Sequence, residues 1–463
     1  MTMSEIKTTM TFGGTALLLG LLALGTVPGR SAPDAFFDIG EPFFPEFTDP
    51  SVATTLEVIE FDEATAAAMP FKVTNQNGLW TIPSHHDYPA DGEDRLAQTA
   101  AGVIDIIKDD FRSDNVADHE ALGVIDPLDE TVSTLTGRGK RVTVKDETET
   151  VLADFIIGNA VGGGGNLRFV RVPGQNRVYA ARMEIDISTR FEDWIEKDLL
   201  QVERGRIDQI ILNDYSINER TLSVTQRGTL VLENTEGQWN ARDIASSEEV
   251  DVGEVGLLLA ALDDLSIVGV RPKPAGVSQD LTRIMQGTAI SRSDLLSLQS
   301  KGYYLTRDGR LLSNEGELLV RTSDGIRYTL RFGEIVYGSG EAVTAGGDAS
   351  DDAESGPGEN RYLFITAQLD MSVFPEPPRP QNTDFEDKEE NEWSDADRAN
   401  KARQDEYAAW EARLSDGRAA AAALATRFTK WYYVISADSF DRLHLQRQDL
   451  VRPSRRNGAR NSA

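Results

Sequence analysis

The chain contains no cysteine and only four histidines among its 463 residues. The lack of cysteine excludes disulfides, thiolate metal sites, a cysteine nucleophile and a lipidated N-terminal cysteine. Basic residues are also scarce, because 47 Lys and Arg face 76 Asp and Glu, which gives a formal net charge of −29. Such a charge opposes binding to nucleic-acid phosphates and to anionic lipid headgroups, except at local basic patches. We therefore expect no nucleic-acid partner.

Recognisable catalytic and cofactor motifs are lacking as well, since the sequence has neither G-x-S-x-G nor H-E-x-x-H. The run His85-His86-Asp87 invites a metal ion, but neighbours on a strand face opposite sides and could share an ion only from a loop. The glycines of Gly162-Gly163-Gly164-Gly165 lack the Lys-Ser/Thr of a phosphate loop and predict a hairpin tip. We expect no catalytic residue, no metal site and no cofactor, and leave open whether His85 and His86 have a role.

One long uncharged run lies near the N-terminus, from Met10 to Val27. It is barely long enough to span a bilayer core of roughly 30 Å. We predict a cytoplasmic stub over residues 1–9 and a transmembrane anchor over residues 10–28, with a cleaved signal peptide as the alternative. Lys7 favours an inside N-terminus. The expected location is therefore the inner membrane, single-pass, with the bulk of the chain on the periplasmic side.

Residues 30–54 are rich in proline and phenylalanine. Proline favours extended and turn conformations, and so many phenylalanines are unsuited to water. We predict a strap that lies on the first domain or near the membrane. The alternative is a docking segment for a membrane partner.

The middle of the chain contains an internal sequence repeat. Gly78-Leu79-Trp80 recurs as Gly237-Gln238-Trp239, and each copy continues through an acidic turn into a helical pattern. Both copies must adopt the same fold, so the repeat is evidence of a duplicated scaffold rather than of a particular activity. We predict a first repeat over residues 55–215 and a second over residues 216–372, with Trp80 and Trp239 in equivalent buried positions.

Later strands extend the correspondence. Phe155–Gly158 matches Leu330–Gly333, and Asn176–Tyr179 matches Asn360–Tyr362. The second copy carries a flexible acidic insertion, residues 338–359, whose Gly, Ser and Asp offer little area to bury. Alternation predicts strands over 55–61, 71–73, 78–82, 141–144, 151–157, 167–172, 177–180, 318–320, 328–332 and 362–366, and helices over 95–111 and 252–265. The fold class is α+β: duplicated antiparallel-sheet-plus-helix units after one N-terminal transmembrane helix.

A long C-terminal helix is predicted over residues 385–434. Large apolar side chains recur there at heptad spacing, at Trp393, Tyr407, Trp410, Leu414, Leu424, Phe428 and Trp431. Asn400, Arg403 and Gly417 interrupt the seam, so packing along the body is favoured over a dimeric coiled coil. Residues 435–451 form an expected docking segment, and residues 452–463 an expected disordered basic tail.

Several of these stretches together resemble the DUF4340 family. They are Gly78–Asp91, Phe155–Gly158, Arg177–Tyr179, Asp193–Leu200 and Ile207–Ile210. In that family the stretch after the tyrosine strand reads Trp-Arg-x-Lys-x-Leu-Leu, whereas this chain has Ile195 in place of the arginine. The resemblance implies no chemistry, because the family has no assigned function. Its members are often encoded beside gliding-motility-type ABC transporter components.

We therefore expect a membrane-anchored extracytoplasmic protein, a non-enzymatic accessory or scaffold subunit of an ABC-type transport or envelope assembly. An ABC permease or auxiliary subunit is the expected partner, and the bilayer is contacted through residues 10–28. The alternative is an envelope glycan-binding protein or hydrolase, supported by Trp80, Trp239 and the many carboxylates. The sequence does not indicate an oligomeric state.

Overall fold

The structure is a computed structural model, and it describes residues 38–454 apart from 164, 186, 219–220, 222, 279–289, 307–308, 338–340 and 346–358. The predicted stub and anchor (residues 1–28), most of the acidic insertion and the end of the basic tail lie outside the described residues. Among the described helices, none combines the length and the apolarity that crossing a bilayer requires.

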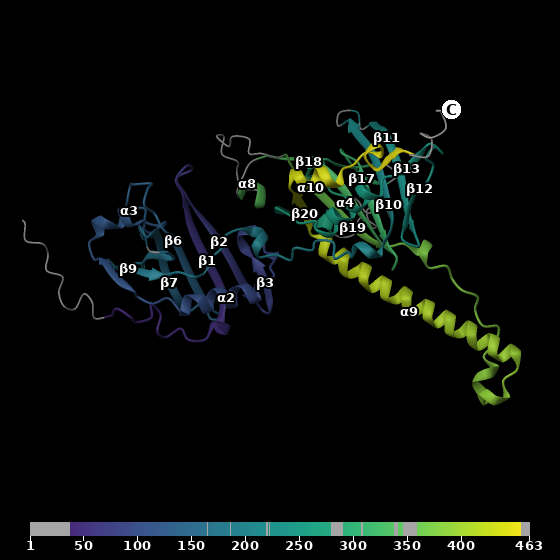
Figure 1. Ribbon diagram of the computed structural model, residues 1–463, viewed down its shortest axis with the longest axis horizontal. Helices are drawn as coiled ribbons and strands as arrows, with labels where there is room; N and C mark the ends of the chain where they lie inside the picture. Colours follow the sequence, from purple (N-terminus) through teal and green to yellow (C-terminus); the bar gives the residue numbers. More distant parts are fainter. Residues whose placement is uncertain are drawn as a thin grey trace, which may run out of the picture. The chain divides into compact units, whose positions relative to one another are not determined.

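The chain divides into two compact units. Unit 1 comprises residues 1–71 and 94–187, and unit 2 comprises residues 72–93 and 188–463. Both are built on antiparallel strands, and a long helix lies near the C-terminus, so the predicted mixed class with antiparallel sheets and a long C-terminal helix is confirmed (Figure 1).

The first sheet has the strand order β4-β3-β2-β1-β6-β7-β8-β9-β5, and the division between the units falls inside β2. Its strands are β1 (Ala53–Asp62), β2 (Ala67–Gln76), β3 (Leu79–Ile82), β4 (Tyr88–Pro89), β5 (Asp110–Ser113), β6 (Lys140–Asp146), β7 (Val151–Ala160), β8 (Leu167–Arg171) and β9 (Val178–Arg182).

The second sheet has the order β12-β11-β10-β17-β18-β19-β20-β14. Its strands are β10 (Ile207–Asn218), β11 (Ser223–Thr235), β12 (Gln238–Ala241), β14 (Gly269–Pro272), β17 (Glu317–Thr322), β18 (Ile326–Val336), β19 (Asn360–Leu369) and β20 (Trp431–Ile435). Two small ribbons accompany it, β13 (Glu248–Val250) with β21 (Val451–Pro453) and β15 (Tyr303–Leu305) with β16 (Leu311–Ser313).

The two sheets follow the same connectivity. Taken from β3 to β5 and from β12 to β14, the strand orders match position by position. The first hairpins also share their register, since Asn75 pairs with Trp80 in one and Asn234 with Trp239 in the other. In both turns the two central residues have positive φ, Asn77 and Gly78 against Glu236 and Gly237, which is the type I′ geometry favoured in two-residue hairpins.

Helices are few. The described ones are α2 (Glu93–Ile104), α3 (His119–Leu122), α4 (Val252–Asp263), α5 (Ala275–Ser278), α7 (Arg292–Gln299), α8 (Glu341–Thr344), α9 (Asp395–Thr429), α10 (Ala437–Leu443) and α11 (Arg447–Leu450). Single 3₁₀ turns are η2 (Pro50–Val52), η3 (Pro83–His85), η4 (Val116–Asp118), η5 (Phe191–Asp193), η6 (Arg204–Arg206), η7 (Met371–Val373), η8 (Asp384–Asp387) and η9 (Glu390–Glu392).

The predicted helix over 95–111 is too long. It ends at Ile104, and Asp110 begins strand β5 at the edge of the first sheet. The α2 helix buries Leu96, Ala100 and Val103 on one face, and Ile106 continues this spacing as a buried residue although it lies beyond the helix. Apolar periodicity therefore predicts the buried face of this helix but not where the helix ends.

The long helix is also shorter than predicted. The residues after it form a strand, which changes how the strands of the two repeats correspond. The α9 helix ends at Thr429, and Trp431–Ile435 form β20 instead of a helical end. All five β20 residues are buried, as expected for an aromatic and β-branched run in a sheet interior. In the strand order, β9 corresponds to β20, whereas the sequence comparison paired β9 with β19.

The strap is described from residue 38 and packs within unit 1. Phe47 is buried, and the Phe43 ring meets the Tyr179 ring edge-on at 5.5 Å. Phe44 lies 5.6 Å from the Phe155 ring, which is itself part of the core. The aromatic side chains of the strap thus gain apolar contacts that solvent would deny them.

Candidate functional site

The most distinctive element of unit 2 is an insertion between two neighbouring strands. In the first sheet β8 and β9 are joined by a short turn, residues 172–177, whereas their counterparts β19 and β20 are joined through residues 370–430, which include α9. In Figure 1 the C-terminal half of α9 lies along the second sheet, and its N-terminal half continues beyond the strands. We call residues 376–406 the arm.

The arm has its own internal support. The α9 helix begins with a capping box in which Ser394 and Asp397 exchange hydrogen bonds, and Lys388 pairs with Asp397 at 2.9 Å. Hydrogen bonds from Ser394 and then from Lys388 lower the pKa of Asp397 to about 2. The Phe385 and Trp393 rings meet edge-on at 5.9 Å, and the indole N–H of Trp393 donates to the Phe385 carbonyl.

One polar residue that interrupts the heptad seam now has a structural role. Asn400 is buried; its side-chain oxygen accepts a hydrogen bond from the Gln381 N–H at 3.1 Å, and its amide donates to the Asn382 side chain at 2.9 Å. The extended segment before the helix is thereby fastened to it. The seam is broken because this face of α9 packs against its own chain rather than against a second helix.

The base of the arm is apolar. Phe374, Trp410 and Leu414 form a buried cluster, and the Trp410 indole N–H donates to the Phe374 carbonyl at 3.1 Å. One helical turn further on, Gly417 lets α9 approach β19 closely, because a Cβ there would lie 2.8 Å from the Leu369 side chain. These contacts confirm that the C-terminal half of the helix packs along the body.

The arm carries a strong charge. Between residues 376 and 406 there are 11 acidic and 5 basic residues, so its formal charge is 5 − 11 = −6. A surface of this sign attracts a cationic partner and is repelled by anionic headgroups.

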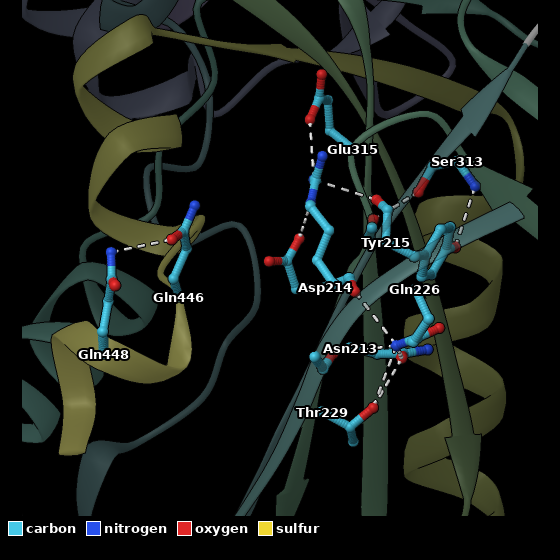
Figure 2. Close-up of polar contacts among 12 residues, drawn as sticks. Asn213, Asp214, Tyr215, Gln226, Thr229, Ser313, Glu315, Gln446 and Gln448 are labelled. Atoms are coloured by element: carbon cyan, nitrogen blue, oxygen red, sulfur yellow. Dashed lines mark hydrogen bonds and ion pairs between the residues drawn. The ribbon is translucent and has the colours of Figure 1, made fainter.

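A polar cleft lies elsewhere in unit 2, between β10, β11 and α11 (Figure 2). Its volume is about 330 Å³, and its lining residues are Leu212, Asp214, Arg227, Gly228, Thr229, Leu230, Gln446, Arg447 and Gln448. The pairing of β10 with β11 shifts register between Asp214 and Tyr215, which is a β-bulge. The Gln226 amide fills the bulge by donating to the Asn213 side chain and to the backbone oxygens of Asp214 and Gly228.

Both cations of this cleft are already engaged, and Arg447 pairs with Glu248 at 2.6 Å. Arg227 donates to Asp214 at 2.7 Å, to the Tyr215 carbonyl at 3.2 Å and to Glu315 at 3.4 Å. Figure 2 shows this network, with Gln446 and Gln448 on the opposite side of the cleft from Asp214. We interpret it as an ion-pair network that stabilises the bulge, because the polar groups that could bind a ligand already pair with protein groups.

The two histidines singled out by the sequence point to different partners. His85 is buried and stacks on Phe191 with ring centroids 4.6 Å apart, while the His86 ring is 2.6 Å from the Ala345 carbonyl oxygen. Burial, with the charges of His86 and Arg271, lowers the pKa of His85 to about 4. Both His86 and Asp87 have positive φ, which turns the chain sharply into β4. His85 is therefore built into the packing of unit 2, whereas His86 is exposed.

The tryptophans of the two hairpins differ from expectation. Trp80 and Trp239 occupy corresponding positions, but both are half-buried, so the prediction of buried core sites is wrong. They lie on short strands near the sheet edge, where fewer neighbours cover a side chain. The fully buried tryptophan is Trp194, whose indole N–H donates to the Ser188 carbonyl at 3.0 Å.

The described glycines of the run, Gly162, Gly163 and Gly165, lie in the hairpin connection between β7 and β8, as predicted. Gly163 and Gly165 both have positive φ, which glycine adopts without strain. Among the described residues there is no group of three or more His, Asp or Glu side chains placed to hold a metal ion.

Two stretches that carry the family resemblance meet inside unit 2. The Asp91 N–H donates to the Trp194 carbonyl at 2.8 Å, and Tyr88 and His85 both contact the Phe191 ring. Leu199 and Leu200 are buried as well, and so is Ile195, which stands where the family has an arginine. The shared pattern thus specifies packing.

One known family matches part of the chain. The family model for a domain of unknown function, DUF4340, matches residues 80–280, which confirms the resemblance. The match begins in β3 of the first sheet and ends beyond β14 of the second, so it spans parts of both units. Comparison with curated proteins and with solved structures gives no match.

Proposed function

We propose that this protein is a non-enzymatic scaffold or accessory subunit of an ABC-type transport or envelope assembly. In this proposal residues 10–28 anchor it in the inner membrane, the bulk of the chain is periplasmic, and the arm is the element that docks a membrane-protein partner. The observation that carries the proposal is the insertion of α9 between β19 and β20, a connection that a short turn makes in the first sheet.

The second sheet does not need the arm in order to form. The first sheet joins the equivalent strands without an insertion, so the arm is not required to close this strand order. Beyond the base cluster, its described contacts are internal, such as those of Trp393 with Phe385 and of Asn400 with Gln381 and Asn382. An ordered, self-supported and charged projection is the form that a docking element takes.

The charge defines the partner surface. Because the arm carries −6 and its acidic side chains are mainly solvent-exposed, a complementary partner presents lysine and arginine. A periplasmic loop or domain of a permease that carries such residues would satisfy this requirement, whereas the headgroup surface of an anionic bilayer would not.

Removing the arm tests the proposal. The Arg379 guanidinium lies 5.1 Å from the Tyr407 ring, so a short Gly-Ser turn can join Arg379 to Tyr407 and omit residues 380–406 while keeping the cluster of Phe374, Trp410 and Leu414. The full-length chain should copurify in mild detergent with a permease or other envelope protein, and the shortened chain should lose that protein while melting at a similar temperature. Recovery of the full-length chain without any envelope protein would count against the proposal.

Charge reversal separates electrostatics from simple loss of contact. Glu389, Glu390 and Glu392 are exposed on the arm, and their combined replacement by lysine should weaken copurification and reduce its salt dependence. The matched control reverses three exposed glutamates outside the arm, Glu46, Glu63 and Glu147. If both triple variants behave alike, net charge and not the arm determines association.

We further infer that the two sheets are copies of one ancestral unit, each covered by one helix. The common strand order, the matched asparagine–tryptophan pairs and the identical turn geometry support this inference. A duplicated scaffold in which one copy gained a projection is consistent with an assembly role.

A glycan-binding role remains the second candidate, and one observation favours it. Trp80 and Trp239 are only half-buried, which leaves part of each indole free to stack on a sugar ring. Addition of soluble cell-wall glycan fragments should then quench or shift tryptophan fluorescence, and Trp80→Phe together with Trp239→Phe should remove the response. An unchanged spectrum at saturating glycan would dispose of this candidate.

A further inference from the structure

Lys273 is the one buried lysine in the described part of the chain. It follows β14 directly and is only 8% exposed. Its backbone N–H donates to the Lys430 carbonyl at 2.8 Å, and its ammonium donates to the Phe428 carbonyl at 3.0 Å. The ammonium also lies 3.6 Å from the centroid of the Phe364 ring. Burial, with the nearby charge of Arg331, holds the pKa of Lys273 well below its usual value.

Part of this environment is structural. Phe428 lies in the last turn of α9, where backbone carbonyls lack helical partners and the helix dipole favours a cation. Lys273 therefore caps the helix with one of its three N–H groups. Among the ion pairs of the described residues none includes Lys273, so its charge has an aromatic face and a carbonyl but no carboxylate.

A cavity of about 290 Å³ opens beside this ammonium. Strand β19 forms one wall and the last turns of α9 form the other, where Ala421, Ala422 and Ala425 are too small to fill the gap. Phe364 and Val277 add apolar surface, and Thr366 and Gln368 add polar groups. The volume is about twice that of a 150 Å³ apolar cavity that takes up benzene.

The cavity is a groove that is partly open to solvent, and the exposed Ala422 lies on its lining. Here the walls belong to a central strand and to a long helix, so the space is bounded by regular elements. A buried cation in an apolar setting costs free energy unless it is paired. An apolar space beside one cation that has no carboxylate partner suits a ligand with an apolar part and a negatively charged group.

We propose that this cavity binds an amphiphile with one aliphatic chain and one carboxylate, and that Lys273 pairs with the carboxylate. The alanine faces of α9 and the ring of Phe364 receive the chain. A single negative charge is expected because the cavity lining contains a single cation. This site is independent of the arm, since none of its lining residues lies between 376 and 406.

The test uses the full chain and three probes of equal chain length: decanoate, 1-decanol and decyltrimethylammonium. Calorimetric titration should show decanoate binding at least about tenfold more tightly than decanol, which corresponds to about 1.4 kcal/mol, and decyltrimethylammonium should not bind. If decanoate does not bind, or binds no better than decanol, the proposal fails.

Two variants locate the site. Lys273→Met keeps an unbranched side chain, one atom shorter and without charge, and should bring decanoate affinity down to that of decanol. Ala422→Trp fills the cavity from an exposed helix position and should abolish binding of both decanoate and decanol. This second variant leaves the buried lysine intact. The control is Lys301→Met, because Lys301 lies 5.2 Å from the Tyr432 ring but does not line the cavity. Persistent carboxylate preference in Lys273→Met, or unchanged binding in Ala422→Trp, would overturn the assignment.

Discussion

At the scale of single residues, His85 makes the stability of unit 2 depend on pH. Its pKa is lowered to about 4 first by burial and then by the charges of His86 and Arg271, whereas an unfolded histidine titrates near 6.5. Between these values the unfolded chain binds more protons than the folded one, so the free energy of unfolding falls as the pH drops from about 6.5 to about 4. The shift corresponds to an upper limit of about 3 kcal/mol.

Replacing His85 by phenylalanine should remove this dependence. Phenylalanine can keep the stack on Phe191, and it has no proton to gain. Urea unfolding of wild type and His85→Phe at several pH values should give a difference in unfolding free energy that widens in favour of the variant as the pH is lowered through this window. A difference that stays constant with pH would show that His85 does not titrate on unfolding.

The tryptophans show where sequence reasoning reaches its limit for a single side chain. Their positions in the hairpins could be predicted because the motif repeats, but their burial could not, because it depends on which strands flank the hairpin in space. Trp194→Ala should cost about 3–5 kcal/mol, since the ring is fully buried and its N–H is hydrogen-bonded. Trp80→Ala should cost clearly less, and chemical denaturation of both variants compares them directly. Equal losses would mean that burial does not set the difference.

At the scale of elements, replacing glycine should have opposite effects on stability at two helical positions. Gly417 of α9 faces β19, where a Cβ would lie 2.8 Å from Leu369, whereas a Cβ at Gly256 of α4 would have no atom within 4 Å. Gly417→Val should destabilise the protein by about 1–3 kcal/mol through overpacking. Gly256→Ala should stabilise it by up to about 1 kcal/mol through helix propensity. Thermal melts decide the sign of each, and a stabilised Gly417→Val would show that α9 can move away from the sheet.

Element types could largely be predicted from the sequence, but element ends could not. The strands over 151–157 and 328–332 and the helix from Val252 were found because apolar periodicity is a local property. Strand β20 was merged into the helix before it, although Trp431–Ile435 reads as a buried strand on its own. The error arose because α9 separates β20 from β19, its partner in the sheet, and pairing between distant segments leaves no local signal.

At the scale of the whole molecule, the repeat could be recognised from sequence, but the way in which the chain is shared between the units could not. Residues 72–93 come from the first half of the chain and nevertheless belong to unit 2. Their anchor is Tyr88, a buried residue whose ring meets Phe191 at 5.5 Å and Trp431 at 5.0 Å. Three segments far apart in sequence therefore meet at one aromatic cluster, and the hydrophobic pattern of each segment alone says nothing of the others.

This sharing predicts which unit a mutation in the first sheet will weaken. Tyr88→Ala removes the ring from the cluster and should cost about 3 kcal/mol, felt by unit 2. Hydrogen exchange should then show reduced protection in β20, with β6, β7 and β8 of unit 1 nearly unchanged. Phe155→Ala, which empties a fully buried site in unit 1, is the matched control and should have the reverse effect. If either variant lowers protection equally in both sets of strands, the units unfold as one cooperative body, because a local loss can spread only where the cores are coupled.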